Sequence, residues 1–187
     1  MILFVFVIDI PQRSLGWQLR IMGYPPTVLP MASLVAVDPG LHGAIAVLAP
    51  SGAITAVPMP LAGGALDLPA IAAIIRDTSP QWLVLEKVAS RPGQGVASMF
   101  KFGQGYGSIL GIAAALGIPC ELVTPQRWKG VVLHGTAKDK AAAIAYCRRA
   151  FPGVSLVPPG CRVPHDGLAD SLCLLEYGRR CLLSQAA

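Results

Sequence analysis

The fold of this chain is decided by residues 34–40, which read LVAVDPG. Four apolar residues lead directly to Asp38, and a Pro-Gly turn follows, as expected for a buried strand that ends in a carboxylate. Residues 82–86, which read WLVLE, repeat the pattern and end in Glu86. The chain has only 10 acidic residues among 187, so acids are scarce. Carboxylates that directly follow apolar runs are therefore expected to be placed by buried strands.

The segments on either side complete an α/β pattern. We expect strands at 33–38, 44–48, 53–57, 82–86 and 120–123, and helices from Asp67 to Ser79, from about Tyr106 to Leu116, from Thr136 to Ala150 and from Asp166 to about Arg180. The first three strands form an antiparallel meander, and α and β elements alternate after it. The sequence therefore predicts a mixed five-stranded sheet with helices on both faces.

Composition limits the class of protein. Hydrophobic residues make up 53% of the chain and charged residues 13%, so one domain with a substantial core is expected. The net charge of +5 favours a polyanionic partner. The five cysteines are odd in number and lack CxxC spacing, which argues against a zinc site and a disulfide framework. We interpret them as reduced thiols of a cytoplasmic protein.

The first residues differ from the rest. Residues 1–10 are apolar, but they are too short to span a membrane, carry Asp9 and lack a basic start, which argues against a membrane anchor and a secretory signal. We predict that residues 1–32 are an irregular extension, with Met31 or Met22 as the natural start. Residues 33–187 are then the functional domain.

Two further acids join Asp38 and Glu86 in a predicted metal site. Asp166 and Asp170 are four residues apart, so they share one face of a helix, and His165 can add a ligand or a base. Clustered carboxylates repel one another, and divalent cations relieve that repulsion. Oxygen ligands favour Mg²⁺, with Mn²⁺ as a substitute. Two such ions about 3.5–4 Å apart can activate a water and stabilise the leaving oxygen of a phosphodiester. An N-cap role is the alternative for Asp166.

Three motifs carry a family resemblance. The motifs VDPG at 37–40, LEK at 85–87 and HDGLADSL at 165–172 resemble those of the RuvC-type Holliday-junction resolvases, within the ribonuclease H-like nucleases. The versions found in bacteriophages and prophages are the most similar. The resemblance extends from about residue 33 to 180.

This resemblance implies a homodimer that makes paired nicks across a four-way DNA junction, with two Mg²⁺ in each active site. It places the protein in the cytoplasm of a bacterial host and identifies Asp38, Glu86 and Asp170 as metal ligands. Bacterial members often place an acid or His three residues before the last Asp, where this chain has Gly167. Asp166 or His165 is then the expected fourth ligand.

The same resemblance extends to residues 98–107, SMFKFGQGYG, which enter the helix after the fourth strand. Phe100, Phe102 and Tyr106 can stack on unpaired bases, while Lys101 meets a phosphate. The alternative is that Phe100 and Phe102 belong to the core or to a dimer interface.

Basic residues near position 130 are the remaining candidates for DNA contact. Lys138 and Lys140 lie near an expected helix N-terminus, and the resemblance places functional lysines there. Lys138 or Lys140 can also neutralise the scissile phosphate in the transition state. Arg127 and Lys129 are expected to contact DNA. Trp128 between them can stack on a nucleotide or pack in the core.

Three other classes of function share parts of this pattern. The Asp-Pro-Gly turn is similar to the phosphate hairpin of actin-like ATPases and sugar kinases, but the second phosphate loop and the duplicated chain are missing. A related nuclease acting on other branched DNA or on RNA–DNA hybrids would use the same metal site. A non-catalytic junction binder is disfavoured because all the carboxylates are retained.

Overall fold

The computed structural model describes residues 32–87 and 95–183. From Ala32 onward the chain forms one compact unit. The predictions about residues 1–31, including the natural start, lie outside the described residues. The strands are β1 (Leu34–Asp38), β2 (Ala44–Leu48), β3 (Ile54–Pro58), β4 (Leu61–Ala62), β5 (Ala65–Leu66), β6 (Trp82–Glu86) and β7 (Cys120–Val123). The helices are α2 (Leu68–Thr78), α3 (Val96–Ala115), α4 (Pro125–Val132), α5 (Lys140–Ala150) and α6 (Asp166–Gly178), with a π-helical turn at Arg179–Leu183.

The main sheet has five strands in the order β3-β2-β1-β6-β7. β1, β2 and β3 pair antiparallel, whereas β6 pairs parallel with both β1 and β7. The mixed five-stranded sheet predicted from the sequence is confirmed. β1 and β6, which end in the two predicted carboxylates, are neighbours in this sheet.

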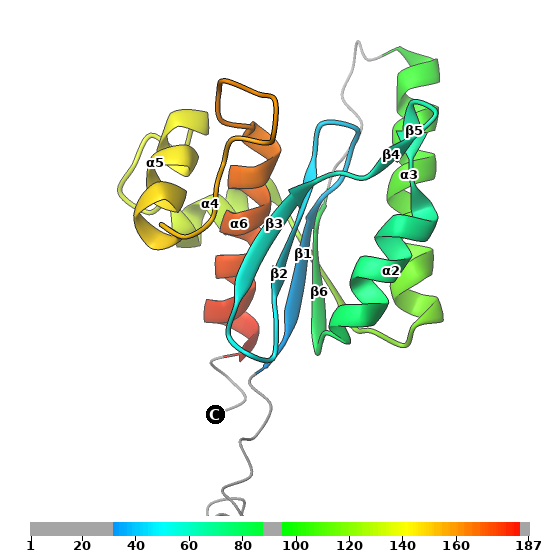
Figure 1. Cartoon of the computed structure of the whole chain (residues 1–187), viewed down its shortest axis with the longest axis horizontal. Helices are drawn as coiled ribbons and strands as arrows, with labels where there is room; N and C mark the ends of the chain where they lie inside the picture. The colour runs from blue at the N-terminus through cyan, green and yellow to red at the C-terminus, as the bar shows by residue number, and fades with distance from the viewer. Residues whose placement is uncertain (1–31, 88–94, 184–187) are drawn as a thin grey trace, which may run out of the picture. The chain divides into compact units, whose positions relative to one another are not determined.

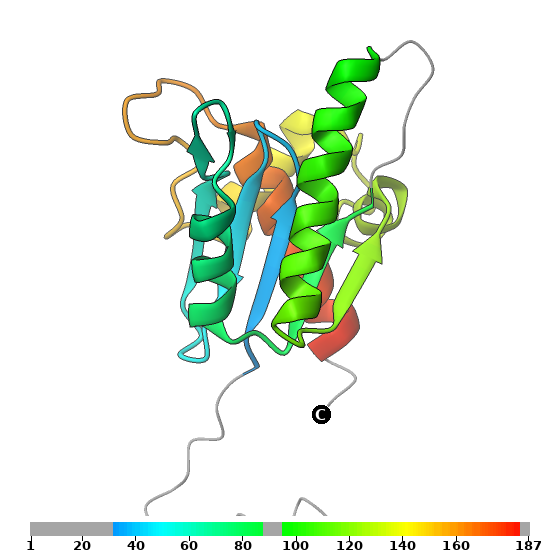
Figure 2. The ribbon, with the colours of Figure 1, turned by 90° about the vertical axis from the view of Figure 1, so that its right-hand side faces the viewer.

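Helices cover both faces of the sheet, as predicted (Figures 1 and 2). Alternation along the strands divides the core into two clusters, because successive side chains point to opposite faces. Leu34, Ala36 and Val84 pack toward α6, while Val35, Val37 and Leu85 pack toward α2 and α3. By the same alternation, Asp38 and Glu86 belong to the α6 side. α4 and α5 pack against α6 on that side.

Helix α3 is longer than predicted. It begins at Val96, about ten residues before Tyr106, so residues 98–107 with their three glycines are helical. One face of α3 packs inward: Phe102 and Tyr106 are half-buried and Ile109 and Ala113 are buried, at successive spacings of four, three and four residues. Packing of this face outweighs the roughly 1 kcal/mol that each glycine costs in a helix interior.

The start of α5 was also predicted wrongly. The helix begins at Lys140, and the carboxylate of Asp139 caps it by accepting the backbone N–H of Ala142 at 2.8 Å. Thr136 instead closes the preceding turn, donating its hydroxyl to the Leu133 carbonyl at 2.8 Å. The N-cap of α5 is therefore Asp139, three residues downstream of the predicted cap Thr136.

Two elements were not predicted. The first is the hairpin of β4 and β5, which turns through Gly63 and Gly64, both at positive φ. The second is α4, whose N-cap Thr124 accepts the backbone N–H of Arg127. No helix in the described part of the chain combines the length and the hydropathy needed to cross a bilayer. All five cysteines lie in that part and are free thiols.

Candidate metal and nucleic-acid site

Two carboxylates emerge side by side where β1 and β6 end. The parallel register pairs Val37 with Leu85, so Asp38 and Glu86, the next residues along each strand, occupy adjacent positions at the same edge. Both alternate onto the face that α6 covers. The two strand-end acids singled out in the sequence therefore lie next to each other in the sheet.

Helix α6 brings the third carboxylate to this edge. Its first turn lies directly on the β1–β2 turn: a Cβ added at Gly167 would be 2.5 Å from the carbonyl oxygen of His42. No side chain fits at position 167, which explains physically why an acid or a His is not found there. Asp170, one turn further, is half-buried beside the ends of β1 and β6.

The electrostatics show that the three acids share one environment. The pKa of Asp38 is raised to about 8, chiefly by burial and in addition by the negative charges of Glu86 and Asp170. Burial is also the largest cause that raises the pKa of Asp170 to about 6, with Glu86 adding to it. The pKa of Glu86 is raised as well, again chiefly by burial. Desolvated, mutually repelling carboxylates are typical of functional sites.

Trp128 and Lys129 of α4 complete the surroundings of Glu86. The indole Nε1–H of Trp128 donates to Glu86 Oε1 at 2.8 Å, and Trp128 is fully buried. Packing is therefore the correct alternative for Trp128. This hydrogen bond and the charge of Lys129 both oppose the rise in the pKa of Glu86, and Lys129 also lowers the pKa of Asp170. Sequence reasoning missed this contact, although Thr-Pro at 124–125 is a usual helix start that would have placed Trp128 in a first turn.

Asp166 pairs with a predicted phosphate-binding lysine. Its carboxylate accepts a hydrogen bond from Lys140 Nζ, and this ion pair raises the pKa of Lys140. Asp166 is the first residue of α6 and also raises the pKa of Asp170. The pair is exposed, with 75% and 44% of the two side chains accessible, so solvent screens it and it opens readily. Asp166 and Lys140 are thus adjacent, and either becomes available when the pair opens.

His165 occupies the N-cap of α6, so the N-cap alternative considered for Asp166 is wrong. Its side chain makes no capping hydrogen bond, and its backbone N–H donates to the Leu156 carbonyl at 2.8 Å. Its Nδ1 is buried and has no hydrogen-bond partner among the described residues. The choice between His165 and Asp166 as fourth ligand stays a prediction.

The remaining basic candidates lie on the α4–α5 side. Lys129 and Lys138, with Pro125 and Gln126, line an open hollow of about 380 Å³. Lys138 has a positive φ of 57° and donates its backbone N–H to Thr136 Oγ1. Two lysines at one hollow suit a phosphate group.

Arg127 is engaged within the protein. Its guanidinium lies 3.4 Å from Glu121 Oε1 and 5.6 Å from the centre of the Tyr177 ring. The salt bridge is with a residue of β7, and Tyr177 belongs to α6. These contacts support a structural role beside the predicted contact with DNA.

The aromatic residues of α3 divide into an inner and an outer set. Phe102 stacks on Tyr106, with ring centres 6.4 Å apart, and its ring lies 3.6 Å from where a Cβ of Gly40 would stand. Phe102 therefore packs against the turn that follows Asp38. Phe100 is 72% exposed, and Lys101 beside it is exposed. Of the aromatic candidates, Phe100 is the one whose ring is largely open to a partner.

The oxygen donors of the three acids suit a divalent cation, but the spacing of their side chains in this structure does not form a metal site. Asp38, Glu86 and Asp170 supply only oxygen donors, and their raised pKa values show a negative cluster that a cation would stabilise. However, among residues 32–87 and 95–183 no group of three His, Cys, Asp or Glu side chains is arranged so as to hold a metal ion. These described residues thus do not form a closed metal site by themselves.

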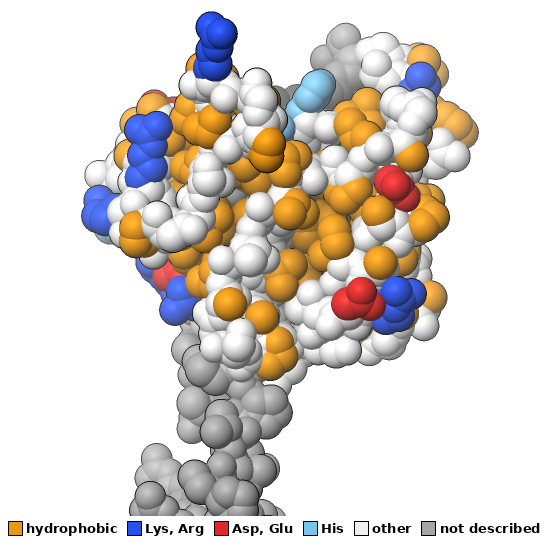
Figure 3. Space-filling model, in the orientation of Figure 1, with side chains coloured by type: hydrophobic (Ala, Val, Ile, Leu, Met, Phe, Trp, Pro, Cys, Tyr) orange, Lys and Arg blue, Asp and Glu red, His pale blue; other side chains and the backbone are white. Residues whose placement is uncertain are grey.

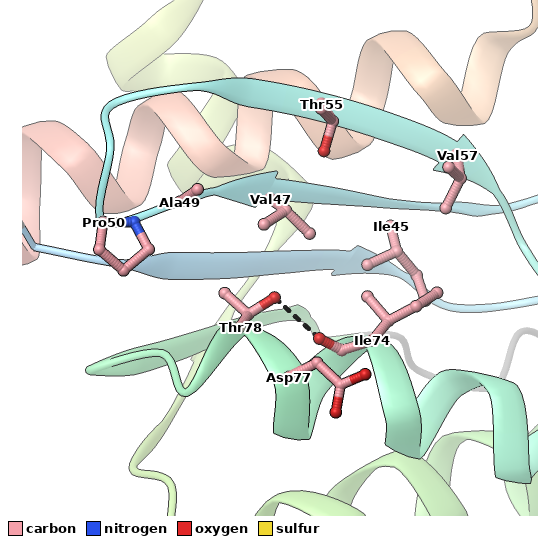
Figure 4. Close-up of a pocket in the computed structure, with 9 residues that line it drawn as sticks. All are labelled: Ile45, Val47, Ala49, Pro50, Thr55, Val57, Ile74, Asp77 and Thr78. Carbon is pink, nitrogen blue, oxygen red and sulfur yellow. Dashed lines mark hydrogen bonds between the residues drawn. The ribbon is translucent and has the colours of Figure 1, made fainter.

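The second hollow of the molecule is chemically different. A groove of about 360 Å³ lies between α2 and strands β2 and β3, lined mainly by apolar side chains such as Ile45, Val47 and Ile74 (Figure 4). Hydrophobic side chains gather over this face (Figure 3). Its one ionisable lining residue is Asp77, which pairs with Arg76. The groove lies on the sheet face opposite the carboxylates, and it has no positive charge for a nucleic acid.

The fold defines an α/β domain of the ribonuclease H-like kind, as the sequence predicted. No protein-family model and no curated protein matches the chain. Among solved structures, it is similar to RuvC from Thermus thermophilus, with 20% identity over 79% of this chain and 95% of that one and a TM-score of 0.53. It is also similar to the same organism's RuvC in complex with a Holliday junction substrate, with 16% identity over 80% and 95% of the two chains and a TM-score of 0.54. The yeast mitochondrial Holliday junction resolvase Ydc2 matches at 14% identity over 87% of this chain and 82% of that one, with a TM-score of 0.46.

Proposed function

We propose that this protein is a structure-selective endonuclease that resolves four-way DNA junctions by paired, metal-dependent nicks. The observation that carries the proposal is the cluster of three half-buried, mutually repelling carboxylates at one sheet edge. The shared fold with a RuvC whose structure holds a Holliday junction substrate supports the choice of substrate.

Asp38, Glu86 and Asp170 would hold Mg²⁺, with Asp166 or His165 as the fourth ligand. Mn²⁺ would substitute for Mg²⁺, because both ions favour oxygen donors. Bound Mg²⁺ supplies stabilisation of the charge that develops during phosphodiester hydrolysis. The burial that raises the pKa of the carboxylates also strengthens their attraction for a cation.

The chain's own cations would orient the DNA. Lys129 and Lys138 share a hollow on the α4–α5 side and would meet backbone phosphates there. Lys140 would join them once it leaves Asp166. Phe100, exposed on α3, would stack on an unpaired base with Lys101 beside it.

Two nicks placed symmetrically across a junction require two active sites, so we propose a homodimer. Sedimentation equilibrium of the protein alone and on junction DNA measures the state directly. A chain that is monomeric on junction DNA would contradict this part of the proposal.

The assay uses end-labelled four-way junction, linear duplex and RNA–DNA hybrid, each with Mg²⁺ and with a chelator. Symmetric nicks confined to the junction and dependent on Mg²⁺ are the expected result. Cleavage of the hybrid instead would move the function to RNA removal with the same carboxylates. Binding of the junction without any cleavage in Mg²⁺ or Mn²⁺ would leave only a junction-binding protein.

Alanine at Asp38, Glu86 or Asp170 tests the site. Each substitution should abolish cleavage while junction binding is retained, because the acids act on the reaction and not on DNA affinity. The matched control is Asp77→Ala, which removes an exposed acid on the opposite face. A near wild-type cleavage rate in any of the three site variants would show that the site is assigned wrongly.

A further inference from the structure

The hydrogen bond between Trp128 and Glu86 joins a buried core residue to a proposed metal ligand. Trp128 has no accessible surface, and its single polar group, Nε1–H, donates to Glu86 Oε1 at 2.8 Å. A buried indole N–H normally needs an acceptor. In this protein the acceptor is a carboxylate at the site, so the packing of the core and the orientation of a functional side chain are linked.

The local structure fixes the indole in place. Glu86 is paired in register with Val123, the last residue of β7, and α4 begins directly after it. Thr124 caps α4, and the backbone N–H of Trp128 donates to the Thr124 carbonyl at 3.2 Å. Trp128 therefore sits in the first turn of a capped helix, five residues after the strand position that lies beside Glu86.

We propose that Trp128 is a positioning residue for Glu86. It occupies Oε1, whereas Oε2 accepts no hydrogen bond from the described residues and is available to bind a divalent cation; this inference rests on the proposed metal-dependent function. A glutamate at a strand end has three rotatable bonds, and one fixed oxygen removes much of that freedom. Partners of this kind orient metal-binding carboxylates, and their loss typically costs 10–100-fold in metal affinity or activity.

The donor is neutral, and that matters for the charge of the site. An arginine or lysine in this position would orient Glu86 but cancel its negative charge, whereas the indole orients it and leaves the charge available to a cation. The positive charge that does lie nearby, Lys129 Nζ, stands 5.2 Å from the centre of the Trp128 ring. The Trp128 ring thus donates a hydrogen bond to Glu86 from its edge, while the Lys129 ammonium group lies over its face.

Trp128→Phe tests the inference, because it keeps an aromatic ring and removes the donor. The matched control is Trp82→Phe, which makes the same change at the other end of the strand that carries Glu86. We expect Mg²⁺ affinity, measured by calorimetry without DNA, to fall 10–100-fold in Trp128→Phe and to stay unchanged in Trp82→Phe. Cleavage of junction DNA should lose kcat with KM for DNA unchanged.

A second measurement does not depend on the Trp128→Phe variant. In the ¹H–¹⁵N spectrum of the wild-type protein, the Trp128 indole signal should move when Mg²⁺ is added, and it should move without metal in Glu86→Ala, which removes its acceptor. The Trp82 signal should move in neither case. A Trp128 signal that stays fixed in both experiments overturns the inference.

The outcomes separate this inference from the proposed function. If Trp128→Phe binds Mg²⁺ as tightly as Trp82→Phe and cuts junctions normally, the positioning role is wrong and the nuclease stands. If Mg²⁺ binding depends on Trp128 in a protein that cleaves no DNA, the positioning role stands and the proposed nuclease is wrong.

Discussion

Asp38 carries the largest electrostatic cost among the three clustered carboxylates, and that cost depends on pH. In the folded chain its pKa is raised to about 8, chiefly by burial, whereas in the unfolded chain it ionises near the ordinary value of 3.8. Between these values the folded state holds a proton that the unfolded state has lost. The stability contributed by this group is therefore complete below about pH 4 and is lost as the pH rises toward 8, by up to about 1.4 kcal/mol per pH unit.

Asp38→Asn should remove the loss of folding stability that accompanies ionisation of Asp38. We expect the free energy of unfolding of the metal-free variant to exceed that of the wild type by a margin that grows from pH 5 to pH 8. Chemical denaturation at each pH measures the margin. Asp77→Asn, which changes an acid whose side chain is 70% exposed, should show no such trend. A margin for Asp38→Asn that is constant with pH would show that burial does not raise this pKa.

Single residues also show what the sequence could reveal about the site. Asp38 and Glu86 were identifiable because each follows an apolar run, and strand pairing brings such ends together. Asp170 followed from its helical spacing and its motif. The bond from Trp128 to Glu86 joins residues 42 apart in the chain, and it depends on how α4 packs, which no local pattern states. The sequence alone allowed Trp128 to stack on a base, although it favoured packing, and it gave no sign of a bond to Glu86.

At the scale of elements, α6 approaches the β1–β2 turn so closely that any side chain at position 167 would be strained. Gly167→Ala would place a Cβ 2.5 Å from the His42 carbonyl oxygen, and backbone atoms on both sides must shift. We expect a loss of about 1–3 kcal/mol in the free energy of unfolding. Because Asp170 is carried by the same helix, cleavage should fall as well.

Gly107→Ala in α3 is the matched control, since a Cβ there meets no atom within 4 Å. It should gain about 0.5–1 kcal/mol, the difference in helix propensity between the two residues. Thermal or chemical denaturation of both variants provides the comparison. A Gly167→Ala variant as stable as the wild type would mean that α6 does not lie against this turn as described.

The elements that the sequence predicted well are those whose ends carry strong local signals. α2 begins after Asp67, whose carboxylate accepts the Ala70 N–H, and ends before Ser79 in the left-handed conformation, as the Asp-cap and Ser-Pro pattern indicated. The helix predicted for α3 was too short because its glycines are typical of a loop. The face of α3 that packs inward can be recognised only when the sheet beneath it is known. α5 had two candidate caps, Thr136 and Asp139, and local sequence does not rank them.

At the scale of the whole molecule, the sheet separates two chemically different sides. The side covered by α6 holds the three carboxylates and the lysines of the 129–140 region, whereas the side covered by α2 holds an apolar groove. The lysines near the site allow a polyanion to approach carboxylates that would otherwise repel it. The lysines and the proposed reaction site are thus on the same side of the sheet.

This arrangement predicts which cations determine the salt dependence of DNA binding. Each phosphate neutralised by a lysine adds about 0.9 to the slope of log K against log salt concentration for duplex DNA. Lys138→Asn should lower the magnitude of that slope by about one and weaken binding to all DNA sequences alike, because a phosphate contact carries no base information. Asparagine is chosen because the backbone φ of 57° at this position suits it better than alanine.

Arg148→Gln is the control, because Arg148 lies in the last turn of α5, at the end away from Lys140. Fluorescence anisotropy with labelled four-way junction at four or five salt concentrations gives both slopes. An equal change in the two variants would show that binding follows net charge alone, and that the lysines beside the carboxylates have no special share in holding the DNA.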